Sequence, residues 1–146
     1  MPTPPIEVAI AILYQDGQFL MQLRDDIPTI VYPGHWSFFG GHLEPGESAD
    51  AAVVRELQEE IAYTAVQLKL FDRRVNSHVI RNIYYGPLSA AVDDLSLNEG
   101  QDLGLCSVAD VERGYRYSAR LAEDRPLGRP HQQILLDFVA QFQGEF

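Results

Sequence analysis

The sequence predicts an α/β fold in which helices cover a mixed β-sheet. Two segments, 48–61 and 131–142, have the apolar spacing of amphipathic helices, and short runs rich in valine, isoleucine and aromatic residues surround them. Strands that alternate with helices in this way are typical of a sheet packed between helical layers. The length of 146 residues suits one domain that spans residues 1–146.

A β-hairpin is expected near the N-terminus. Glu7–Tyr14 and Gln18–Arg24 are predicted strands, and the Gln15-Asp16-Gly17 segment between them supplies the turn. Prolines and a glycine then indicate a loop over Asp25–His35.

The later strands are expected to be short. Trp36–Phe39 is predicted as an aromatic strand that ends at Gly40-Gly41. The last helix is entered through Pro130 and has one apolar face. Between these elements, further strands are predicted over Val66–Phe71, Val79–Ala91 and Leu103–Ser107.

The segment 48–61 has two contrasting faces. Ser48 is its expected N-cap. At about 100° per residue, one face is apolar and consists of Val53, Val54, Leu57 and Ile61. Glu56, Glu59 and Glu60 fall within about 100° of arc on the other side. Like charges at this spacing repel each other, so a compensating cation is expected beside them.

The charge balance limits the partners of the chain. A formal net charge of -10 argues against a nucleic-acid polymer or an anionic lipid surface as partner. No apolar run approaches the ~20 residues of a membrane span, and the N-terminus lacks a secretory signal. The single cysteine, Cys106, lies in an apolar run and is predicted to be a core residue. A cytoplasmic protein is therefore expected.

The acidic face predicts a hard divalent ion. Carboxylate oxygens select Mg²⁺ or Mn²⁺, and no histidine or cysteine pattern for zinc competes with them. Such an ion, open on one side, attracts phosphate oxygens and activates water. A solvated acidic helix face, with Arg55 in an ordinary intrahelical pair, is the alternative that spacing alone leaves open.

The residues before and within this helix form a known pattern. Gly40-Gly41 permits close approach of backbone to a ligand, and Glu47 stands just before the helix. The segment Gly41–Tyr63 resembles the signature of the Nudix hydrolases, in which one glycine, one arginine and four glutamates recur at fixed spacings. Those positions are Gly41, Glu47, Arg55, Glu56, Glu59 and Glu60 in this chain. The resemblance implies a Nudix-type α/β/α sandwich, with the mixed sheet between helices.

The resemblance also implies hydrolysis of a nucleoside diphosphate linked to a further group, with Mg²⁺ or Mn²⁺ as cofactor. By position, the metal ligands would be Glu56, Glu59, Glu60 and the backbone carbonyl of Gly40. Arg55 and Glu47 would pair and orient the catalytic helix. The general base is either Glu56 or Glu99, a glutamate in a downstream loop that would also contact metal. A surface position in a turn is the other interpretation of Glu99.

Substrate contacts are less well defined. Arg24 and Gly41 occupy positions that are expected to contact substrate, although Arg24 would equally suit an exposed strand end. His35 and His42, on either side of the glycine pair, are more typical of local structural hydrogen bonds. The aromatic residues Trp36, Phe38 and Phe39 suit either stacking on a base or the core.

The chain departs from the signature at the end of the helix. Ala62 stands in place of the final glycine, and Tyr63 follows where an aliphatic residue is usual. A left-handed helix end would cost alanine about 1 kcal/mol relative to glycine. The departure concerns the helix exit, because no charged ligand is lost.

The expected substrate is a nucleoside triphosphate, oxidised or noncanonical ones included, cleaved to monophosphate and pyrophosphate. The matches at Arg24 and Glu99 favour it. The alternatives are a pyrophosphatase of nucleoside diphosphate sugars or dinucleotides, a non-catalytic domain that senses nucleotides, and a structural domain with an acidic helix. The sequence leaves the oligomeric state open between a monomer and a homodimer.

Overall fold

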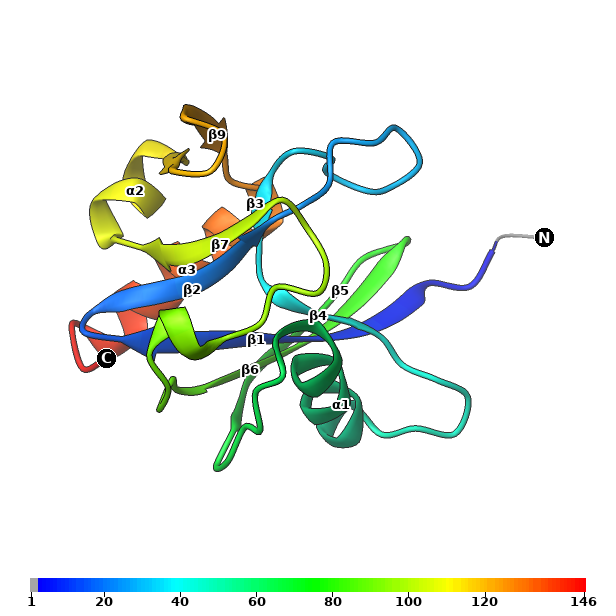
Figure 1. Cartoon of the computed structure of the whole chain (residues 1–146). Coiled ribbons are helices and arrows are strands. Elements are labelled where there is room, and N and C mark those ends of the chain that lie inside the picture. The colour runs from blue at the N-terminus through cyan, green and yellow to red at the C-terminus, as the bar shows by residue number, and fades with distance from the viewer. Residues whose placement is uncertain (1–2) are drawn as a thin grey trace.

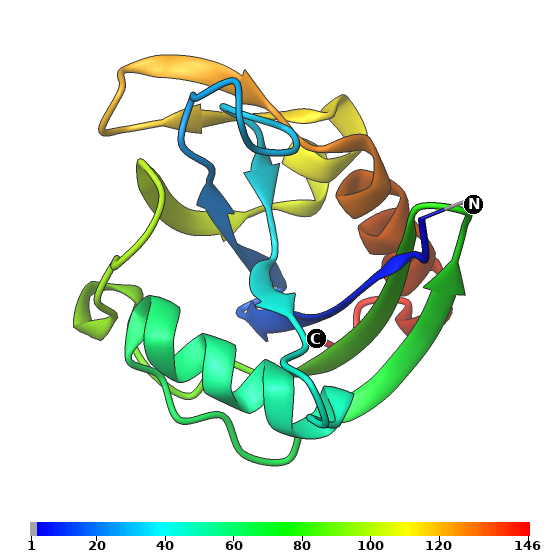
Figure 2. The ribbon, with the colours of Figure 1, turned by 90° about the vertical axis from the view of Figure 1, so that its right-hand side faces the viewer.

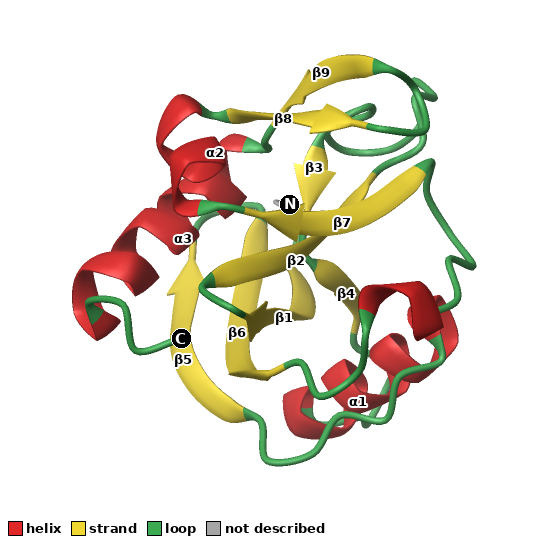
Figure 3. Cartoon of the chain, turned by 60° about the vertical axis from the view of Figure 1, so that its left-hand side comes forward, coloured by secondary structure: helices red, strands yellow, loops and turns green. Residues whose placement is uncertain are grey.

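A computed structural model describes residues 3–146 and contains a mixed seven-stranded sheet with helices on both sides (Figures 1 and 3). None of the helices in this range is long and apolar enough to cross a membrane. In chain order the elements are β1 (Ile6–Gln15), β2 (Gln18–Leu23), β3 (Trp36–Ser37), β4 (Phe39–His42), α1 (Ala49–Ile61), β5 (Lys69–Val75), β6 (Val79–Pro87), the 3₁₀ turn η1 (Val92–Asp94), β7 (Asp102–Cys106), α2 (Val108–Arg113), β8 (Tyr115–Ser118), β9 (Glu123–Pro126) and α3 (Arg129–Phe142).

Strand β1 organises the sheet. The strand order is β3-β2-β1-β6-β5, and β4 and β7 pair with β1 and β2 respectively. Strand β1 runs parallel to β6 and antiparallel to β2 and β4, so the sheet is mixed. The predicted hairpin between β1 and β2 is confirmed. Its turn residues Asp16 and Gly17 have φ values of 54° and 74°, the left-handed pair that matches strand twist in a two-residue turn.

Two hydrophobic layers hold the helices against the sheet. Leu57 and Ile61 of α1 are fully buried against one face, and Ile134, Leu135 and Phe138 of α3 against the other. Figures 1 and 3 show α1 on one side of the sheet and α2 and α3 on the other. The predicted α/β/α sandwich is therefore confirmed. Cys106 lies in the core, as expected.

The predicted aromatic strand Trp36–Phe39 is in fact two strands. Trp36 and Ser37 pair with β2, and the chain then changes partner so that β4 pairs with β1. Figure 2 shows this cyan segment between the β8–β9 hairpin and α1. The consequence is that Gly40 and Gly41 lie within β4 rather than after it, directly beside β1.

Two other strand boundaries were wrong. The strand predicted over Val66–Phe71 is β5, which begins at Lys69 and continues through Val75. The charged residues of β5 do not form the apolar run that predicts a strand. An edge strand that is exposed on much of its surface does not need such a run. The strand predicted over Val79–Ala91 is β6, which ends earlier, at Pro87. Proline has no backbone N–H, so Pro87 cannot donate a hydrogen bond to the neighbouring strand.

Some elements had no usable sequence signal. The short helix α2 and the β8–β9 hairpin were not predicted, because neither has a long apolar repeat. Val54 was assigned to the core face of α1 but its surface is 40% exposed. It lies at the edge of that face, beside a cavity of about 470 Å³ that Leu70 and Tyr84 also line.

Helix α1 ends in the left-handed geometry that the missing glycine would favour. Ala62 has φ 52° and ψ 36°, and its N–H donates to the carbonyl of Gln58. Since the alanine keeps this strained conformation, Ala62→Gly should raise the melting temperature by about 2 °C, as expected for ~0.5–1 kcal/mol in a chain of this size. Thermal unfolding followed by circular dichroism measures the shift.

The control for this change is Ala140→Gly, on an exposed right-handed position of α3. It should lower the melting temperature, because glycine costs up to about 1 kcal/mol inside a helix. If both variants were destabilised alike, the strain assigned to Ala62 would be absent.

Candidate active site

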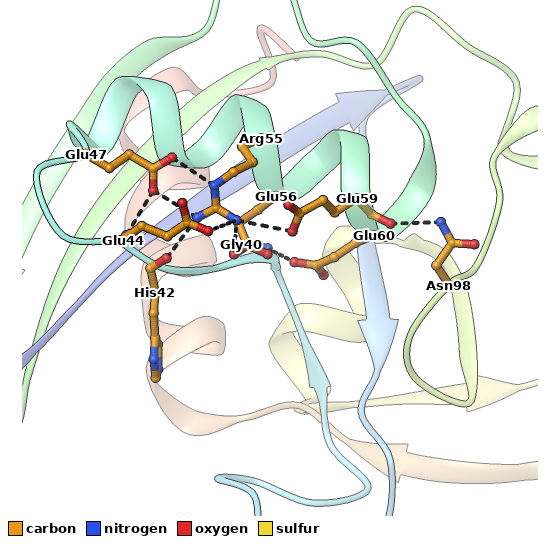
Figure 4. Close-up of polar contacts among 9 residues, drawn as sticks. All are labelled: Gly40, His42, Glu44, Glu47, Arg55, Glu56, Glu59, Glu60 and Asn98. Atoms are coloured by element: carbon orange, nitrogen blue, oxygen red, sulfur yellow. Dashed lines mark hydrogen bonds and ion pairs between the residues drawn. The ribbon is translucent and has the colours of Figure 1, made fainter.

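Arg55 lies at the centre of the polar contacts on α1 (Figure 4). Its Nε and Nη2 atoms donate to the two oxygens of Glu47 at 2.8 and 2.9 Å, and Nη2 also donates to the carbonyl of His42 at 3.1 Å. Its Nη1 donates to Glu56 at 3.0 Å and to Glu59 at 3.1 Å. One guanidinium thus fastens the loop before α1 to the acidic face of the helix.

The pairing of Arg55 with Glu47 changes the ionisation of both groups. The hydrogen bond from Arg55 is the largest cause that lowers the pKa of Glu47, from 4.5 to about 2. The same hydrogen bond raises the pKa of Arg55 above its ordinary value. Both groups are therefore charged throughout the neutral range. The Ser48 hydroxyl caps the helix by accepting from the N–H of Ala51, as predicted.

Glu60 is the most deeply buried acid of the signature. Only 3% of its surface is exposed, and its carboxyl oxygens accept from the N–H of Gly40 at 3.1 Å and from Nε2 of Gln22 at 3.2 Å. Burial, followed by the neighbouring carboxyl of Glu56, raises the pKa of Glu60 to about 9. Without a bound cation, Glu60 is thus neutral at pH 7.

Glu56 packs against the glycine pair. A Cβ atom added at Gly41 would lie 2.7 Å from the Glu56 carboxyl carbon, which is closer than atoms can approach. Glycine at this position therefore leaves room for the Glu56 carboxylate beside β4. Glu56 and Glu60 together bring two acids to the backbone of Gly40 and Gly41.

The third acid, Glu59, shares the Nη1 atom of Arg55 with Glu56. Its side chain is 58% exposed and contacts Arg55. Within residues 3–146, no three acidic, histidine or cysteine side chains are already arranged as a metal site. The donor set nevertheless fits Mg²⁺ or Mn²⁺, since it consists of oxygens and since burial and the neighbouring carboxyl of Glu56 both raise the pKa of Glu60, which a cation would offset. For all three to bind one ion, their carboxylates would have to come closer together than they are in this structure.

The loop between η1 and β7 packs on the same side of the sheet as α1 and contacts the end of this helix. Asn98 donates through its side chain to the carbonyl of Glu59 at 2.8 Å and through its N–H to that of Glu60 at 2.9 Å. Glu99, the next residue, is exposed and near enough to Glu60 to contribute to its raised pKa. The predicted loop glutamate is therefore located beside the acidic cluster.

The residues considered as substrate contacts differ in their exposure and in their hydrogen bonds. Trp36, Phe38 and Phe39 are at most 2% exposed, so they are core residues and are not free to stack on a base. Nδ1 of His35 donates to the carbonyl of Pro33 at 2.9 Å, which is a local structural hydrogen bond. Arg24 is partly buried, and its Nε atom has no hydrogen-bond partner within the described residues.

The sequence does not predict the roles of Gln22 and Asn98. Gln22 interrupts the apolar run of β2 and is 5% exposed, which is the kind of buried polar position that calls for a partner. Asn98 gave no signal beyond its position in a turn, because its role depends on where the loop meets α1.

Comparison with known proteins agrees with this geometry. The NUDIX domain family model matches residues 3–125. The CTP pyrophosphohydrolase of Escherichia coli is 43% identical over 60 residues, which are 41% of this chain and 43% of that protein. A putative 8-oxo-dGTP diphosphatase of Bacillus subtilis is 39% identical over 56 residues, 38% of this chain and 34% of that protein. The matched segments thus span less than half of these relatives.

Solved structures share the whole fold. The MutT protein of Methanosarcina mazei superimposes with a TM-score of 0.73 at 20% identity, covering 97% of both chains. The NUDIX domain of Shewanella oneidensis NrtR, solved with ADP ribose, gives a TM-score of 0.71 at 19% identity, covering 96% of this chain and 90% of that one. The family match, extending over most of the chain, and the arrangement of the signature residues identify this protein as a member of the Nudix family.

Proposed function

We propose that this chain is a metal-dependent pyrophosphohydrolase of nucleotides. The observation that carries the proposal is the pair of acids, Glu56 and Glu60, held at the backbone of Gly40-Gly41 with Glu99 close by. A magnesium or manganese ion bound beside these acids would neutralise the charge of the substrate phosphates and lower the pKa of a bound water molecule. Glu56, Glu59, Glu60, Glu99 and the Gly40 carbonyl are its proposed ligands.

The remaining residues of the signature would position this chemistry. Arg55 and Glu47 keep the β4–α1 loop against the helix and so fix Gly41 beside Glu56. Water adds to phosphorus, the bridging P–O bond breaks, and the proton of the water passes to a carboxylate. Glu56 and Glu99 are the two proposed acceptors of that proton.

A nucleoside triphosphate, oxidised and noncanonical ones included, is the proposed substrate. The names of the two curated relatives, a CTP pyrophosphohydrolase and a putative 8-oxo-dGTP diphosphatase, support this class. Nucleoside diphosphate sugars and dinucleotides are the second class. The products would be a nucleoside monophosphate and, from a triphosphate, pyrophosphate.

A panel of nucleotides tests the proposal. Nucleoside di- and triphosphates, nucleotide sugars and dinucleotides are incubated with Mg²⁺ or Mn²⁺, and phosphate and pyrophosphate are measured separately. The proposal predicts multiple turnover of at least one triphosphate, lost in EDTA and in Glu59→Gln. The altered helix end at Ala62 motivates a nucleotide sensor as the competing function. Calorimetric binding of a nucleotide without any product would establish that alternative.

A further inference from the structure

Two arginines face each other across strands β5 and β6, yet only one has counter-ions. Arg74 and Arg81 are direct partners in the antiparallel register. Arg74 pairs with Asp72 at 3.0 Å and with Asp137 of α3 at 2.7 Å. The guanidinium of Arg81 has no hydrogen bond or ion pair among residues 3–146. Like charges directly opposite destabilise a sheet, so the fold gives no reason for Arg81.

Arg81 is also partly buried. Burial lowers its pKa, and the neighbouring ionisable group that counteracts this is Tyr32, not a carboxylate. Burying a cation without a counter-ion costs free energy, and this chain has 21 acidic residues that could have supplied one. An anion from outside the chain would compensate this charge.

Arg24 is a second arginine near His131, as Arg81 is. Its Nε atom is buried and has no hydrogen-bond partner among the described residues. Both arginines lie close enough to His131 to help lower the pKa of this histidine to about 3, an effect dominated by burial. Neutral His131 accepts the N–H of Phe38 at Nδ1, so its Nε2 carries the proton and is a further donor. Three donor groups therefore lie in one region, and none of them is hydrogen-bonded to a carboxylate among the described residues.

This cluster of Arg24, Arg81 and His131 lies on the α3 side of the sheet, whereas the acids of the candidate active site lie on the α1 side. Val8 of β1 pairs with Arg81 on one side and with His42 on the other. Arg81 is therefore two strand spacings, roughly 10 Å, from the strand that carries Gly40 and Gly41. His131 contacts Phe38, just before that strand. A nucleotide bound at the acidic cluster would therefore reach the arginines by passing β4 at its glycine pair, where the backbone carries no side chains.

We propose that Arg81 binds a phosphate or carboxylate group of the substrate, next to Arg24, for which the Nudix resemblance already implies a substrate contact. Arg81 would then be a residue that determines specificity. The assignment to substrate rests on the proposed function, whereas the anion site does not. Guanidinium groups match the oxygens of both anions in pairs of hydrogen bonds.

The anion site is tested without metal or turnover. Thermal unfolding is followed in EDTA, with and without millimolar inorganic phosphate or pyrophosphate, for the wild type, Arg81→Met and Arg73→Met. Arg73 is exposed on β5 and loses the same charge, so it is the matched control. Phosphate should raise the melting temperature of the wild type and of Arg73→Met but not of Arg81→Met. Without phosphate, Arg81→Met should be at least as stable as the wild type, because an uncompensated buried charge is removed.

Kinetics test the assignment to substrate. Arg81→Met should raise KM for the best nucleotide of the panel at least about 10-fold, with kcat changed less than about threefold, and Arg73→Met should change neither. If Arg81→Met lowered the melting temperature and left KM unchanged, Arg81 would have a structural role and the proposal would be overturned. Loss of the phosphate effect with KM unchanged would overturn the assignment to substrate. If the wild type turned over no nucleotide, the proposed function would fail while the phosphate measurement still decided the anion site.

Discussion

Replacing Glu60 with glutamine should reduce kcat/KM for nucleotide hydrolysis at least about 100-fold, a loss of ~2.7 kcal/mol in transition-state stabilisation. Glutamine offers a divalent ion one neutral oxygen in place of a carboxylate. The same change should leave the fold intact. The carboxamide oxygen can still accept from the N–H of Gly40, and its NH2 group can donate to Gln22 if the amide of Gln22 turns its oxygen towards it.

The pH dependence separates this effect from misfolding. The unfolded chain releases the Glu60 proton above pH 4.5, whereas the folded protein without metal keeps it up to a pKa of about 9. Wild-type stability in EDTA therefore falls as the pH rises from about 4.5 to about 9. Glu60→Gln lacks this proton, so its melting temperature relative to the wild type should rise with pH across that window.

Glu112→Gln, an exposed acid on α2, is the matched control. It removes one charge as well but should change neither the activity nor the pH dependence. Full activity of Glu60→Gln with Mg²⁺ would contradict the role assigned to Glu60. A collapse of its melting temperature at pH 8 would instead show that the carboxylate supports the fold in its ionised form.

Replacing Arg55 with lysine should lower kcat about 10-fold or more although the charge is kept. A lysine ammonium cannot donate to both oxygens of Glu47 and at the same time reach Glu56, Glu59 and the carbonyl of His42, as the guanidinium does. The loop that holds Gly41 beside Glu56 would then be free to move. Arg55 is a positioning residue, so KM should change less than kcat.

Acid titration gives Arg55 a readout independent of activity. The hydrogen bond from Arg55 holds the pKa of Glu47 near 2, so the contribution of the pair to stability is present above pH 4.5 and is lost as the pH falls through about 2. The melting temperatures of the wild type and Arg55→Lys should therefore differ most above pH 4.5 and converge towards pH 2. The control Arg113→Lys, at an exposed ion pair on α2, should follow the wild type in activity. Wild-type kcat in Arg55→Lys would contradict the positioning role.

The sequence predicted what depends on local chemistry. The turn at Asp16-Gly17, the cap at Ser48 and the apolar stripe of α1 each follow from a few neighbouring residues. The acidic face of α1 also follows from local helical spacing. The resemblance to the Nudix signature predicted that Glu47 pairs with Arg55, as the structure shows. Ala62 was recognised as a departure, and the structure shows that its left-handed geometry is kept.

What the sequence could not supply depends on contacts between distant segments. The burial of Glu60 requires Gln22 from β2 and Gly40 from β4, neither of which is adjacent to it in the chain. The split of the aromatic segment at Phe38 follows from competition between β1 and β2 for a partner. Arg81 could not be distinguished from Arg74 until α3 placed Asp137 beside only one of them.

The central claim is that the three glutamates of the acidic helix face, together with Glu99 and the carbonyl of Gly40, hold a divalent ion. The most direct measurement is the anomalous density of crystals soaked in Mn²⁺ with a non-hydrolysable nucleotide. The account predicts a peak within about 2.5 Å of oxygens from Glu56, Glu60 and the Gly40 carbonyl, with Glu59 turned from Arg55 towards the ion. If Glu59 remained on Arg55 and no peak lay beside Glu56 and Glu60, the claim would be wrong.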